Sequence, residues 1–328
     1  MTAATTFDSL ERLAETFGSK QPSKRMLVIV NPYATTVSDR LKHLVVYALQ
    51  GRYQVDSVET EARGHATELC REAAQEGYDV VCAFGGDGTV NEAANGLAGS
   101  GTPLTCLPGG STNVFARILG IPNDVVDATE HMLRMADDWR PRPIDLGIVN
   151  DRRFLFTAGM GLDASVTRRV DARPRLKARF GPWFYSWAAV SAFNRDYVVK
   201  PPKLVAELPG GETIEGVTAM VQNTMPYTYF GTRPIDLAEG VALDDGTLAG
   251  VVLKRASPLD MPTVTWRALS GSARIVGHRR VAAFSGSEAV TVRSRDDREL
   301  PLQVDGDYLG TVPEAVFGVD HHAVQIVA

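Results

Sequence analysis

The stretch of this sequence that decides its fold is Phe84-Gly85-Gly86-Asp87-Gly88-Thr89-Val90-Asn91-Glu92. An apolar run over 80–83 precedes it and a helix-forming run over 93–97 follows, so the order predicts a strand, a glycine turn and a helix. The glycines let the backbone approach a ligand closely and adopt positive φ without a Cβ penalty. The N–H groups at the start of the helix favour an anion. Asp87 would repel a bare phosphate, so it indicates Mg²⁺ beside a nucleotide triphosphate; the alternative is an ordinary glycine-rich turn.

A second turn of the same kind follows a short apolar strand over 103–107. It reads Pro108-Gly109-Gly110-Ser111-Thr112-Asn113 and leads into a helical run over 114–119. Two such units place both loops at the carboxyl edge of a parallel sheet, where open α/β sheets bind ligands. Ser111 or Thr112 either donates to a phosphate or only caps the next helix. No Gly-Lys-Ser/Thr follows the glycines, which excludes a Walker P-loop. The first loop also lacks the third glycine of the Gly-x-Gly-x-x-Gly dinucleotide fingerprint, which excludes that motif.

The order of elements predicts two domains. Strands at 26–30 and 54–59 alternate with helices at 38–50 and 65–76, which indicates a doubly wound parallel sheet, an α/β domain over 25–146. Short alternating runs between Gly, Pro and Asp turns then predict an antiparallel β-rich, sandwich-like domain over 147–328. Its expected strands lie at 204–208, 217–221, 248–253 and 289–292. Residues 1–24 are interpreted as an appendage, and the active site is expected in the cleft between the domains.

Composition is that of an enzyme rather than a nucleic-acid binder. The 328 residues carry a net charge of −5, which argues against a nucleic-acid partner. Cys70, Cys82 and Cys106 have no metal-ligand spacing and are expected to be reduced thiols. No apolar run approaches ~20 residues and the start has no secretory pattern. These features predict a cytoplasmic protein that visits the inner face of the membrane if its substrate is a lipid.

The two glycine loops, with Asn91-Glu92 after the first and Phe115-Ala116-Arg117 after the second, resemble the diacylglycerol kinase catalytic family. This family includes bacterial soluble lipid kinases and the sphingosine and ceramide kinases. The first loop alone is shared with NAD kinases and phosphofructokinases, but the ordered set over roughly 26–310 is much more specific. The further matching motifs are Asn31-Pro32, Asp145-Leu146-Gly147, Gly159-Met160-Gly161-Leu162-Asp163-Ala164, Asp244-Asp245-Gly246-Thr247-Leu248 and Val304-Asp305-Gly306-Asp307.

The resemblance implies ATP and Mg²⁺ as cofactors. Phosphoryl transfer needs a phosphate cradle, a cation and an aligned nucleophile, and Asp87 and Asp145 are the candidate ligands of the catalytic Mg²⁺. Asp145 could instead only cap a turn. The family often has Asp where this chain has Val114, so one carboxylate of its usual acidic network is missing. The expected nucleotide contacts are Asn31, Thr60, Gly85, Gly86, Asp87, Gly88, Thr89, Asn91, Gly110, Ser111 and Asn113.

Two Asp-Gly segments carry further expectations from the resemblance. The family places a general base, normally Glu, after an Asp-Gly pair, and this chain has Asp307 there. The alternative is that Asp305-Gly306 is only a hairpin turn and Asp307 its solvated neighbour. Asp245, with the carbonyl groups of Ala242 and Thr247, matches the family's structural Mg²⁺ loop. An Asp-Gly turn between two strands is the alternative there, and both can hold at once.

The segment from Arg168 to Trp187 has the composition of a membrane-binding surface. Basic residues attract anionic headgroups, and aromatic rings settle at the polar boundary of a bilayer. Prolines at 174 and 182 interrupt it, so one smooth amphipathic helix is excluded. The alternative is a solvated basic loop followed by a core helix over 183–193. Its basic residues are Arg168, Arg169, Arg173, Arg175, Lys177 and Arg179, and its aromatic residues are Phe180, Trp183, Phe184, Tyr185 and Trp187.

Three functions compete at this point. The leading one is an ATP- and Mg²⁺-dependent lipid kinase that acts on diacylglycerol or a similar amphiphile, with Asp307 as the base. The second is an NAD kinase-like phosphotransferase, which the second loop and the 304–307 turn disfavour. The third is a non-catalytic nucleotide- or lipid-binding regulator, because Val114 and Asp307 depart from the family pattern. The sequence leaves open which lipid and nucleotide are used and whether the chain forms a homodimer.

Overall fold

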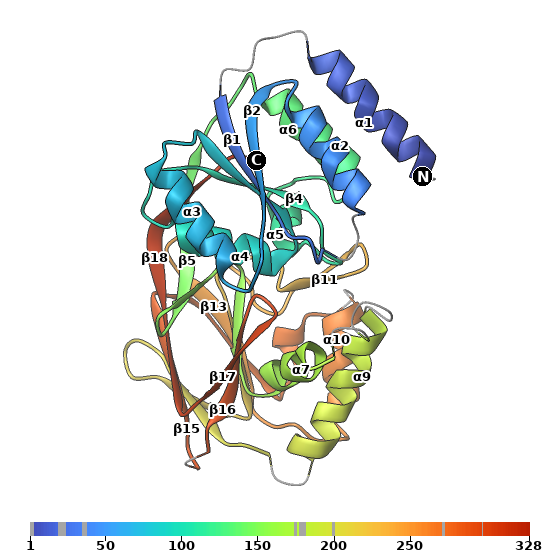
Figure 1. Ribbon diagram of the computed structural model, residues 1–328. Helices are drawn as coiled ribbons and strands as arrows, with labels where there is room; N and C mark the ends of the chain where they lie inside the picture. Colours follow the sequence, from blue (N-terminus) through green and yellow to red (C-terminus); the bar gives the residue numbers. More distant parts are fainter. Residues whose placement is uncertain are drawn as a thin grey trace. The chain divides into compact units, whose positions relative to one another are not determined.

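The chain folds into two compact units in the computed structural model (Figure 1). Unit 1 comprises Met1–Ile144 and His322–Ala328, and unit 2 comprises Asp145–His321. The structure describes residues 3–18, 24–34, 38–173, 176, 182–198, 201–270, 273–296 and 298–328.

Unit 1 is built on a parallel sheet in the order β2-β1-β3-β4. These strands are β1 (Lys24–Val30), β2 (Tyr53–Glu59), β3 (Val80–Gly85) and β4 (Leu104–Pro108). Every residue of β3 and β4 is buried, as expected for parallel strands covered on both faces. The end of β18 (Glu314–Ile326) adds a fifth parallel strand, with Ile326 beside Leu104. The predicted parallel α/β layer is confirmed.

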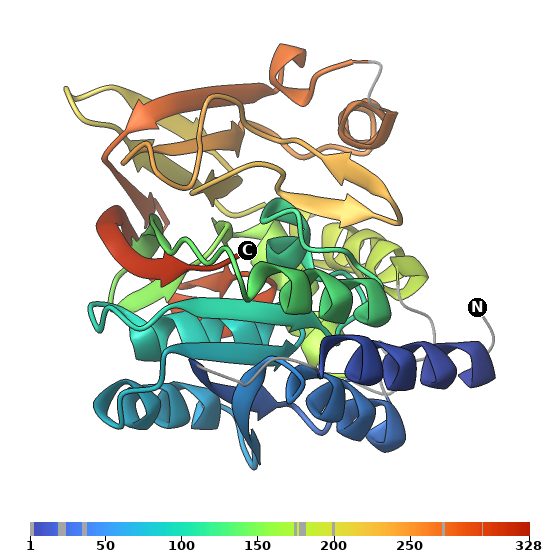
Figure 2. The same cartoon turned by 90° about the horizontal axis from the view of Figure 1, so that it is seen from above.

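Helices cover both faces of this sheet. Figures 1 and 2 show α1, α2 and α6 on one side of it and α3 and α4 on the other. Ser38 caps α2 as predicted, because its Oγ accepts the Leu41 N–H at 3.4 Å. The helices of unit 1 are α1 (Ala3–Phe17), α2 (Asp39–Leu49), α3 (His65–Gln75), α4 (Asp87–Leu97), α5 (Val114–Ile118) and α6 (Val125–Met135).

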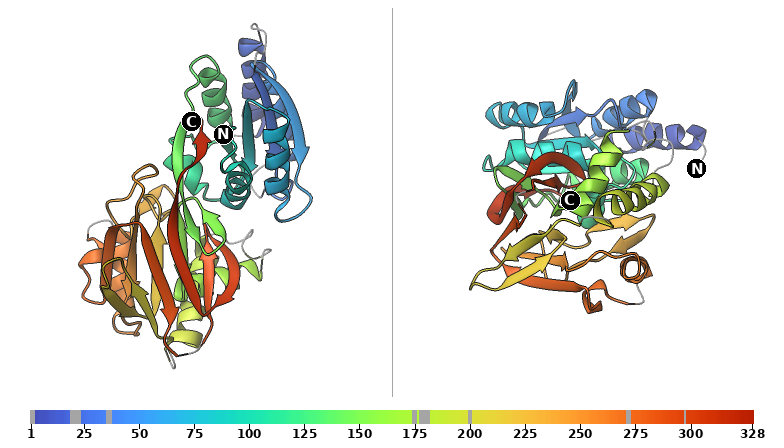
Figure 3. Two further views of the ribbon diagram at one scale, coloured as in Figure 1. Left: turned by 90° about the vertical axis from the view of Figure 1, so that its left-hand side faces the viewer. Right: turned by 90° about the horizontal axis from the view of Figure 1, so that it is seen from below.

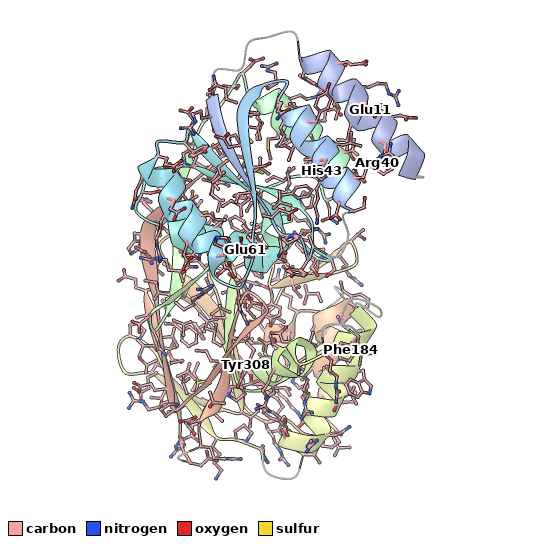
Figure 4. The ribbon with its side chains drawn as sticks, viewed as in Figure 1. Glu11, Arg40, His43, Glu61, Phe184 and Tyr308 are labelled. Carbon is pink, nitrogen blue, oxygen red and sulfur yellow. The ribbon has the colours of Figure 1, made fainter. Side chains whose placement is uncertain are left out.

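The N-terminal helix α1 belongs to this helix layer, whereas the sequence predicted only an appendage over 1–24. Leu10 is fully buried. The Arg40 guanidinium of α2 lies 4.4 Å from the centre of the Phe7 ring of α1, and Figure 4 labels Arg40 beside this helix. The amphipathic pattern of α1 therefore buries one face against α2 and α6.

Helices α3 and α4 pack closely because of a glycine and a shared cap. The residue before α3 is Gly64, which has no side chain for capping. Glu92 of α4 supplies the missing acceptor: its carboxylate takes the N–H groups of Gly64 at 2.8 Å and Ala66 at 3.3 Å. The helix backbones meet at Gly96, where a Cβ would lie 2.5 Å from the Thr67 carbonyl oxygen.

Unit 2 is an antiparallel β sandwich, as predicted. One sheet has the order β14-β13-β10-β7-β16-β17, and the other joins β18, β15, β8 and β9 and includes β5 and β6. In chain order, the first six strands of the sandwich are β5 (Arg142–Val149), β6 (Arg152–Phe154), β7 (Thr157–Met160), β8 (Leu204–Glu207), β9 (Thr213–Gly216) and β10 (Thr218–Gln222). The later ones are β13 (Leu248–Leu253), β14 (Val281–Ser287), β15 (Ala289–Ser294), β16 (Leu300–Val304) and β17 (Asp307–Val312).

Two hydrophobic cores form on the two faces of the six-stranded sheet. One lies between the sheets and includes Val221, Leu302 and Phe317 (Figure 3, left). The other lies between the six-stranded sheet and its helices, and includes Val251 and Val264. The remaining elements are α7 (Leu162–Asp171), α9 (Pro182–Ala192), a π-helix (Phe193–Tyr197), α10 (Met261–Ser270), a 3₁₀ turn (Ile275–Gly277) and the hairpin of β11 (Thr228–Phe230) and β12 (Arg233–Ile235).

The division of the chain also differs from the predicted domains at its C-terminal end. The sequence placed all of 147–328 in one domain, but the last seven residues belong to unit 1. The cause is a single long strand: β18 pairs with β15 at one end, and Ile326 and Val327 bond to Leu104 at the other. No described helix combines the length and the hydrophobicity that a bilayer crossing requires.

We expect Gly96→Ala to destabilise the protein by about 1–3 kcal/mol, because the added methyl would force α3 and α4 apart. Denaturant unfolding measures the change. Gly318→Ala is the matched control, since its Cβ would meet nothing within 4 Å, and its effect should stay within about 0.5 kcal/mol. Equal effects of the two substitutions would contradict the proposed packing role of Gly96.

Candidate active site

The two glycine loops of unit 1 touch backbone to backbone. The Gly109 N–H donates to the Gly85 carbonyl oxygen at 2.8 Å. A Cβ on Gly110 would lie 2.8 Å from the Cα of Gly86, and a Cβ on Gly109 would lie 3.0 Å from the Cα of Gly85. The glycines are therefore needed for contact between the loops, which leaves two backbone turns side by side at the carboxyl edge of the sheet.

The glycines of the first loop do not adopt the positive φ that glycine permits. The φ angles of Gly85, Gly86 and Gly88 all lie outside the positive, left-handed region, and Gly86 has φ −91°. The reason is that α4 begins at Asp87, so Gly88 already belongs to the first helical turn. The positive φ occurs in the second loop at Asn113, with φ 49°.

Asp87 connects the two loops through its carboxylate. Its Oδ1 accepts the Phe115 N–H at the start of α5, at 3.0 Å. The N-cap residue of α5 is Asn113, which makes no side-chain capping bond, so neither Ser111 nor Thr112 caps this helix. Asp87 is also the first residue of α4, and a carboxylate at a helix N-terminus is stabilised by the helix dipole. The structure thus holds this carboxylate in a fixed orientation.

Asn113 closes the second loop on itself. Its Oδ1 accepts the Gly110 N–H at 2.8 Å, and its Nδ2 donates to the Gly110 carbonyl oxygen at 2.9 Å and to Asn123 at 2.9 Å. These bonds explain a buried asparagine with a left-handed backbone. Ser111, by contrast, is exposed at the tip of the loop. A direct contact of either residue with a nucleotide stays a prediction.

The other predicted nucleotide residues support the first loop. The Asn31 amide donates to Thr89 Oγ1 at 2.9 Å, which ties the loop after β1 to the first turn of α4. The Thr60 N–H donates to the Val30 carbonyl oxygen at 2.9 Å. Asn91 is buried, and the Asn95 amide donates to its carbonyl oxygen at 2.8 Å. The structure therefore joins Asn31 to α4 by a side-chain bond, whereas the bond of Thr60 is a backbone bond to the end of β1.

The three cysteine thiols are free and buried. Burial raises the pKa of the Cys106 thiol, with a smaller contribution from the Asp87 carboxylate, and burial also raises the pKa of Cys82. Burial raises the pKa of Cys70 to about 12. These thiols are protonated at neutral pH and carry no nucleophilic chemistry.

In unit 2, the buried Asp145 is bonded to the loop that contains Asp245. Its backbone N–H donates to the Leu243 carbonyl oxygen at 2.6 Å, and its Oδ2 accepts the Gly246 N–H at 2.8 Å. Asn223 Nδ2 donates to the Asp145 carbonyl oxygen at 2.9 Å. The position of the Asp145 carboxylate is thus set by the segment from 243 to 246, some hundred residues later in the chain.

The predicted structural Mg²⁺ loop forms a turn around Asp245. Asp245 Oδ2 accepts the Ala242 N–H at 2.7 Å, and Oδ1 accepts the Thr247 N–H at 2.9 Å and the Thr247 hydroxyl at 3.0 Å. The loop is therefore closed by its own hydrogen bonds. A carboxylate oxygen has two lone pairs; Oδ1 already accepts two hydrogen bonds, whereas Oδ2 accepts one and keeps a lone pair for a cation, and the Mg²⁺ site stays a prediction. Within the described residues, no three His, Cys, Asp or Glu side chains converge as a metal site.

Asp305 anchors the hairpin that presents Asp307. Its carboxylate accepts three successive backbone N–H groups, from Leu155 at 2.7 Å and from Phe156 and Thr157 at 3.0 Å each. Asp305 and Gly306 both have positive φ and join β16 to β17 in a two-residue hairpin turn. Asp307 is the first residue of β17 and is half-buried; its neighbour Tyr308 is labelled in Figure 4. Asp305 and Gly306 therefore form the hairpin turn that the alternative interpretation expected. The role of Asp307 as a general base stays a prediction.

The half-buried carboxylate of Asp163 is a feature to which the sequence gave no role. Tyr227 donates its hydroxyl to Asp163 Oδ1 at 2.5 Å, and Gln303 donates its amide to Oδ2 at 2.6 Å. Burial raises the pKa of Asp163, while these two hydrogen bonds oppose the shift. The sequence signal for Asp163 was the pair of nearby glycines, Gly159 and Gly161. The Asp163 carboxylate needs Gly159 beside it, because a Cβ on Gly159 would lie 2.6 Å from Asp163 Oδ2.

The segment 168–187 is described only in part, because 174, 175 and 177–181 lie outside the described residues. Arg169 pairs with Asp196 at 2.8 Å. The Arg173 guanidinium lies 5.4 Å from the centre of the Trp187 ring, which stacks on Phe184. Phe184 is buried in a small cluster with Val170 and Ala188, whereas Trp187 is half exposed. In its described part, helix α9 therefore combines a core face, which includes Phe184, with the exposed ring of Trp187.

Comparison with known protein families matches two models in series. Residues 25–148 match the diacylglycerol kinase catalytic domain, and residues 157–328 match the YegS C-terminal NAD kinase beta sandwich-like domain. The second match covers more than half of the chain.

Comparison with individual proteins finds relatives along nearly the whole chain. A diacylglycerol kinase of Bacillus subtilis is 29% identical over 306 residues, which are 91% of this chain and 95% of the relative. A diacylglycerol kinase of Staphylococcus aureus is 28% identical over 305 residues, which are 91% of each chain. A solved structure from Bacillus anthracis has a TM-score of 0.72 at 24% identity and covers 94% of this chain and 96% of that one, which shows the shared fold.

We expect Asp305→Ala to destabilise the protein by about 2–4 kcal/mol, because it leaves three buried N–H groups without their acceptor. Asp305→Asn should cost less, since its amide oxygen can still accept the Phe156 and Thr157 N–H groups. Thermal and denaturant unfolding measure both changes. The exposed Asp151→Ala is the control; if it cost as much as Asp305→Ala, the anchoring role would be refuted.

Proposed function

Because the chain belongs to the diacylglycerol kinase family of lipid kinases, we propose that it transfers the terminal phosphoryl group of ATP to a hydroxyl of diacylglycerol or a similar amphiphilic lipid, in a Mg²⁺-dependent reaction. The observation that carries the proposal is the Asp87 carboxylate, fixed between two glycine loops at the carboxyl edge of a parallel sheet. The words 'NAD kinase' in the description of the C-terminal family model refer to a sandwich fold and add no argument for NAD as a substrate.

The phosphates of ATP are proposed to bind at the start of α4. Gly86 is the N-cap residue and has no side chain to occupy the first N–H groups of the helix, so they suit an anion. Gly85, Gly86 and Gly110 keep the loop surface free of Cβ atoms, which lets a triphosphate approach the backbone. Ser111 is exposed and can donate its hydroxyl to a phosphate oxygen.

The carboxylates of Asp87 and Asp145 are proposed to hold the catalytic Mg²⁺. Their oxygen atoms are the hard ligands that this ion prefers, and each carboxylate is oriented by a backbone N–H, from Phe115 and from Gly246. When bound, the ion neutralises charge that develops on the phosphate oxygens. A second, structural Mg²⁺ is proposed at Asp245, with the Ala242 and Thr247 carbonyl groups, where the loop geometry is already fixed.

Asp307 is proposed to accept the proton of the lipid hydroxyl. It is half-buried, so a substrate can reach it, and it directly follows the anchored Asp305-Gly306 turn. The Gly306 N–H also donates to Gln303 at 2.9 Å, which fixes the turn further. A base is effective when its position is set before the reaction, and this anchoring supplies that condition.

The proposed function places the enzyme at a membrane surface, where its lipid substrate resides. The segment 168–187 is proposed to contribute basic and aromatic contacts there. Among its described residues, Trp187 is half exposed and Arg173 lies over its ring, an arrangement that suits the polar boundary of a bilayer.

Phosphoryl transfer from radiolabelled ATP with Mg²⁺ tests the function directly. We expect label in diacylglycerol or a related lipid when diacylglycerol, monoacylglycerol, ceramide, sphingosine, phosphatidylglycerol and NAD are offered separately. Labelling of NAD alone would replace the lipid proposal. Absence of transfer to any acceptor, with nucleotide still bound, would favour a regulatory protein.

We expect Asp307→Asn to lower turnover at least ~100-fold with ATP binding retained, because the amide cannot accept the proton. Asp307→Glu should keep much of the turnover, since it retains a carboxylate on a longer chain. Steady-state kinetics and nucleotide titration separate the two effects, and the exposed Asp151→Asn serves as control. Unchanged turnover in Asp307→Asn would remove this residue from the mechanism.

A further inference from the structure

Helix α10 exposes an apolar stripe on the side opposite its buried face. Met261, Val264 and Ala268 face the core of unit 2. Successive helical residues rotate by about 100°, so Pro262, Trp266 and Leu269 fall together on the opposite side. The exposed apolar stripe consists of these three residues with Leu259, which lies in the turn before the helix. Leu259 is 90% exposed and Trp266 is 56% exposed.

The exposed stripe belongs to a firmly attached helix. Asp260, at the start of α10, is buried and accepts hydrogen bonds from the Ser257 hydroxyl at 2.8 Å and from Arg279 and Arg280 at 3.2 Å each. Thr263 contacts the His278 ring at 3.0 Å. The apolar side chains are therefore presented by a fixed scaffold.

The surroundings of α10 are strongly basic. Residues 254–280 contain six Lys or Arg and a single acidic residue, Asp260, a net charge of +5 in a chain whose total is −5. Lys254 and Arg255 are exposed, and Arg279 keeps 76% of its side chain exposed despite its bond to Asp260. Arg274 pairs with Glu239 at 2.9 Å and is 77% exposed. The six basic residues are Lys254, Arg255, Arg267, Arg274, Arg279 and Arg280.

Helix α10 lies on the same flank of unit 2 as α9. Figures 1 and 2 both show the two helices on that flank. Val264 of α10, Leu162 of α7 and Tyr197 after α9 pack in one core, on the same face of the six-stranded sheet. Among the residues whose side chains the structure describes, this flank therefore carries two exposed tryptophans, Trp187 and Trp266.

We propose that the exposed apolar stripe of α10 is a membrane-docking surface for an anionic bilayer. Trp266, Leu259 and Leu269 enter the boundary between headgroups and acyl chains, and the surrounding Lys and Arg side chains pair with lipid phosphates. The inference rests on the proposed function, since a lipid kinase meets its substrate in a bilayer. It assigns a surface separate from the segment 168–187.

Charge favours a bilayer over a second copy of the chain as the occupant. An isologous dimer through the stripe would bring the same six basic residues of both chains together. Like charges at such a contact repel, whereas an anionic headgroup layer supplies the opposite charge over the whole flank.

Vesicle co-sedimentation without ATP and without diacylglycerol tests the proposal. We expect Trp266→Ser/Leu269→Ser to bind vesicles of phosphatidylglycerol and phosphatidylcholine at least ~10-fold more weakly than the unmodified chain. Lys254→Glu/Arg255→Glu should reduce binding to these vesicles, whereas binding to pure phosphatidylcholine changes little. Tyr47→Ser, which removes a 57% exposed aromatic from α2 of unit 1, is the matched control and should bind as the unmodified chain does.

Unchanged binding by Trp266→Ser/Leu269→Ser would overturn the proposal, as would equal losses in Tyr47→Ser. A shift from dimer to monomer in sedimentation velocity would assign the stripe to a second copy of the chain instead. Trp187→Ser, measured in parallel, separates the contribution of α9. Because the assay contains no nucleotide or lipid substrate, its outcome is independent of whether phosphoryl transfer to lipid is observed.

Discussion

The contact between the two glycine loops of unit 1 is the constraint on which the candidate site depends. Gly109 and Gly110 meet the backbone of Gly85 and Gly86 so closely that neither Gly109 nor Gly110 has room for a Cβ atom. This contact sets the distance between the ends of β3 and β4 and brings the first turn of α4 beside that of α5. Asp87 then bonds across the contact, so its carboxylate direction follows from the backbone and not from its own rotamer preference. Such orientation before binding is what charge stabilisation in phosphoryl transfer requires.

Unit 2 uses the same principle with different residues. Asp305 places its carboxylate on three N–H groups, and Asp145 and Asp245 each bond to backbone N–H groups around the 242–247 loop. Acidic residues close in sequence therefore have different tasks: Asp305 holds the hairpin, and Asp307 starts the strand that the hairpin presents. A carboxylate that accepts hydrogen bonds from backbone N–H groups is better positioned than one on a flexible loop.

Much of the framework followed from local pattern. The strands at 26–30 and 80–83 and the capped helix after Ser38 were predictable, because apolar runs, glycines and a capping serine act within a few residues of one another. Which property of glycine the first loop uses could not be predicted from local pattern. Glycine permits positive φ but also permits close approach, and only the position of the second loop shows that approach is the requirement here.

The sequence by itself determined the fold class, the family and the candidate residues around Asp87 and Asp307, because these depend on short motifs whose chemistry is local. Tertiary structure alone decided which carboxylates accept hydrogen bonds from backbone N–H groups, how β18 returns the chain to unit 1, and that Asp163 accepts a hydrogen bond from Tyr227. It also decided which face of α10 is exposed. The physical reason is that burial and hydrogen-bond partners arise from contacts between residues far apart in the chain, and no local pattern specifies these contacts.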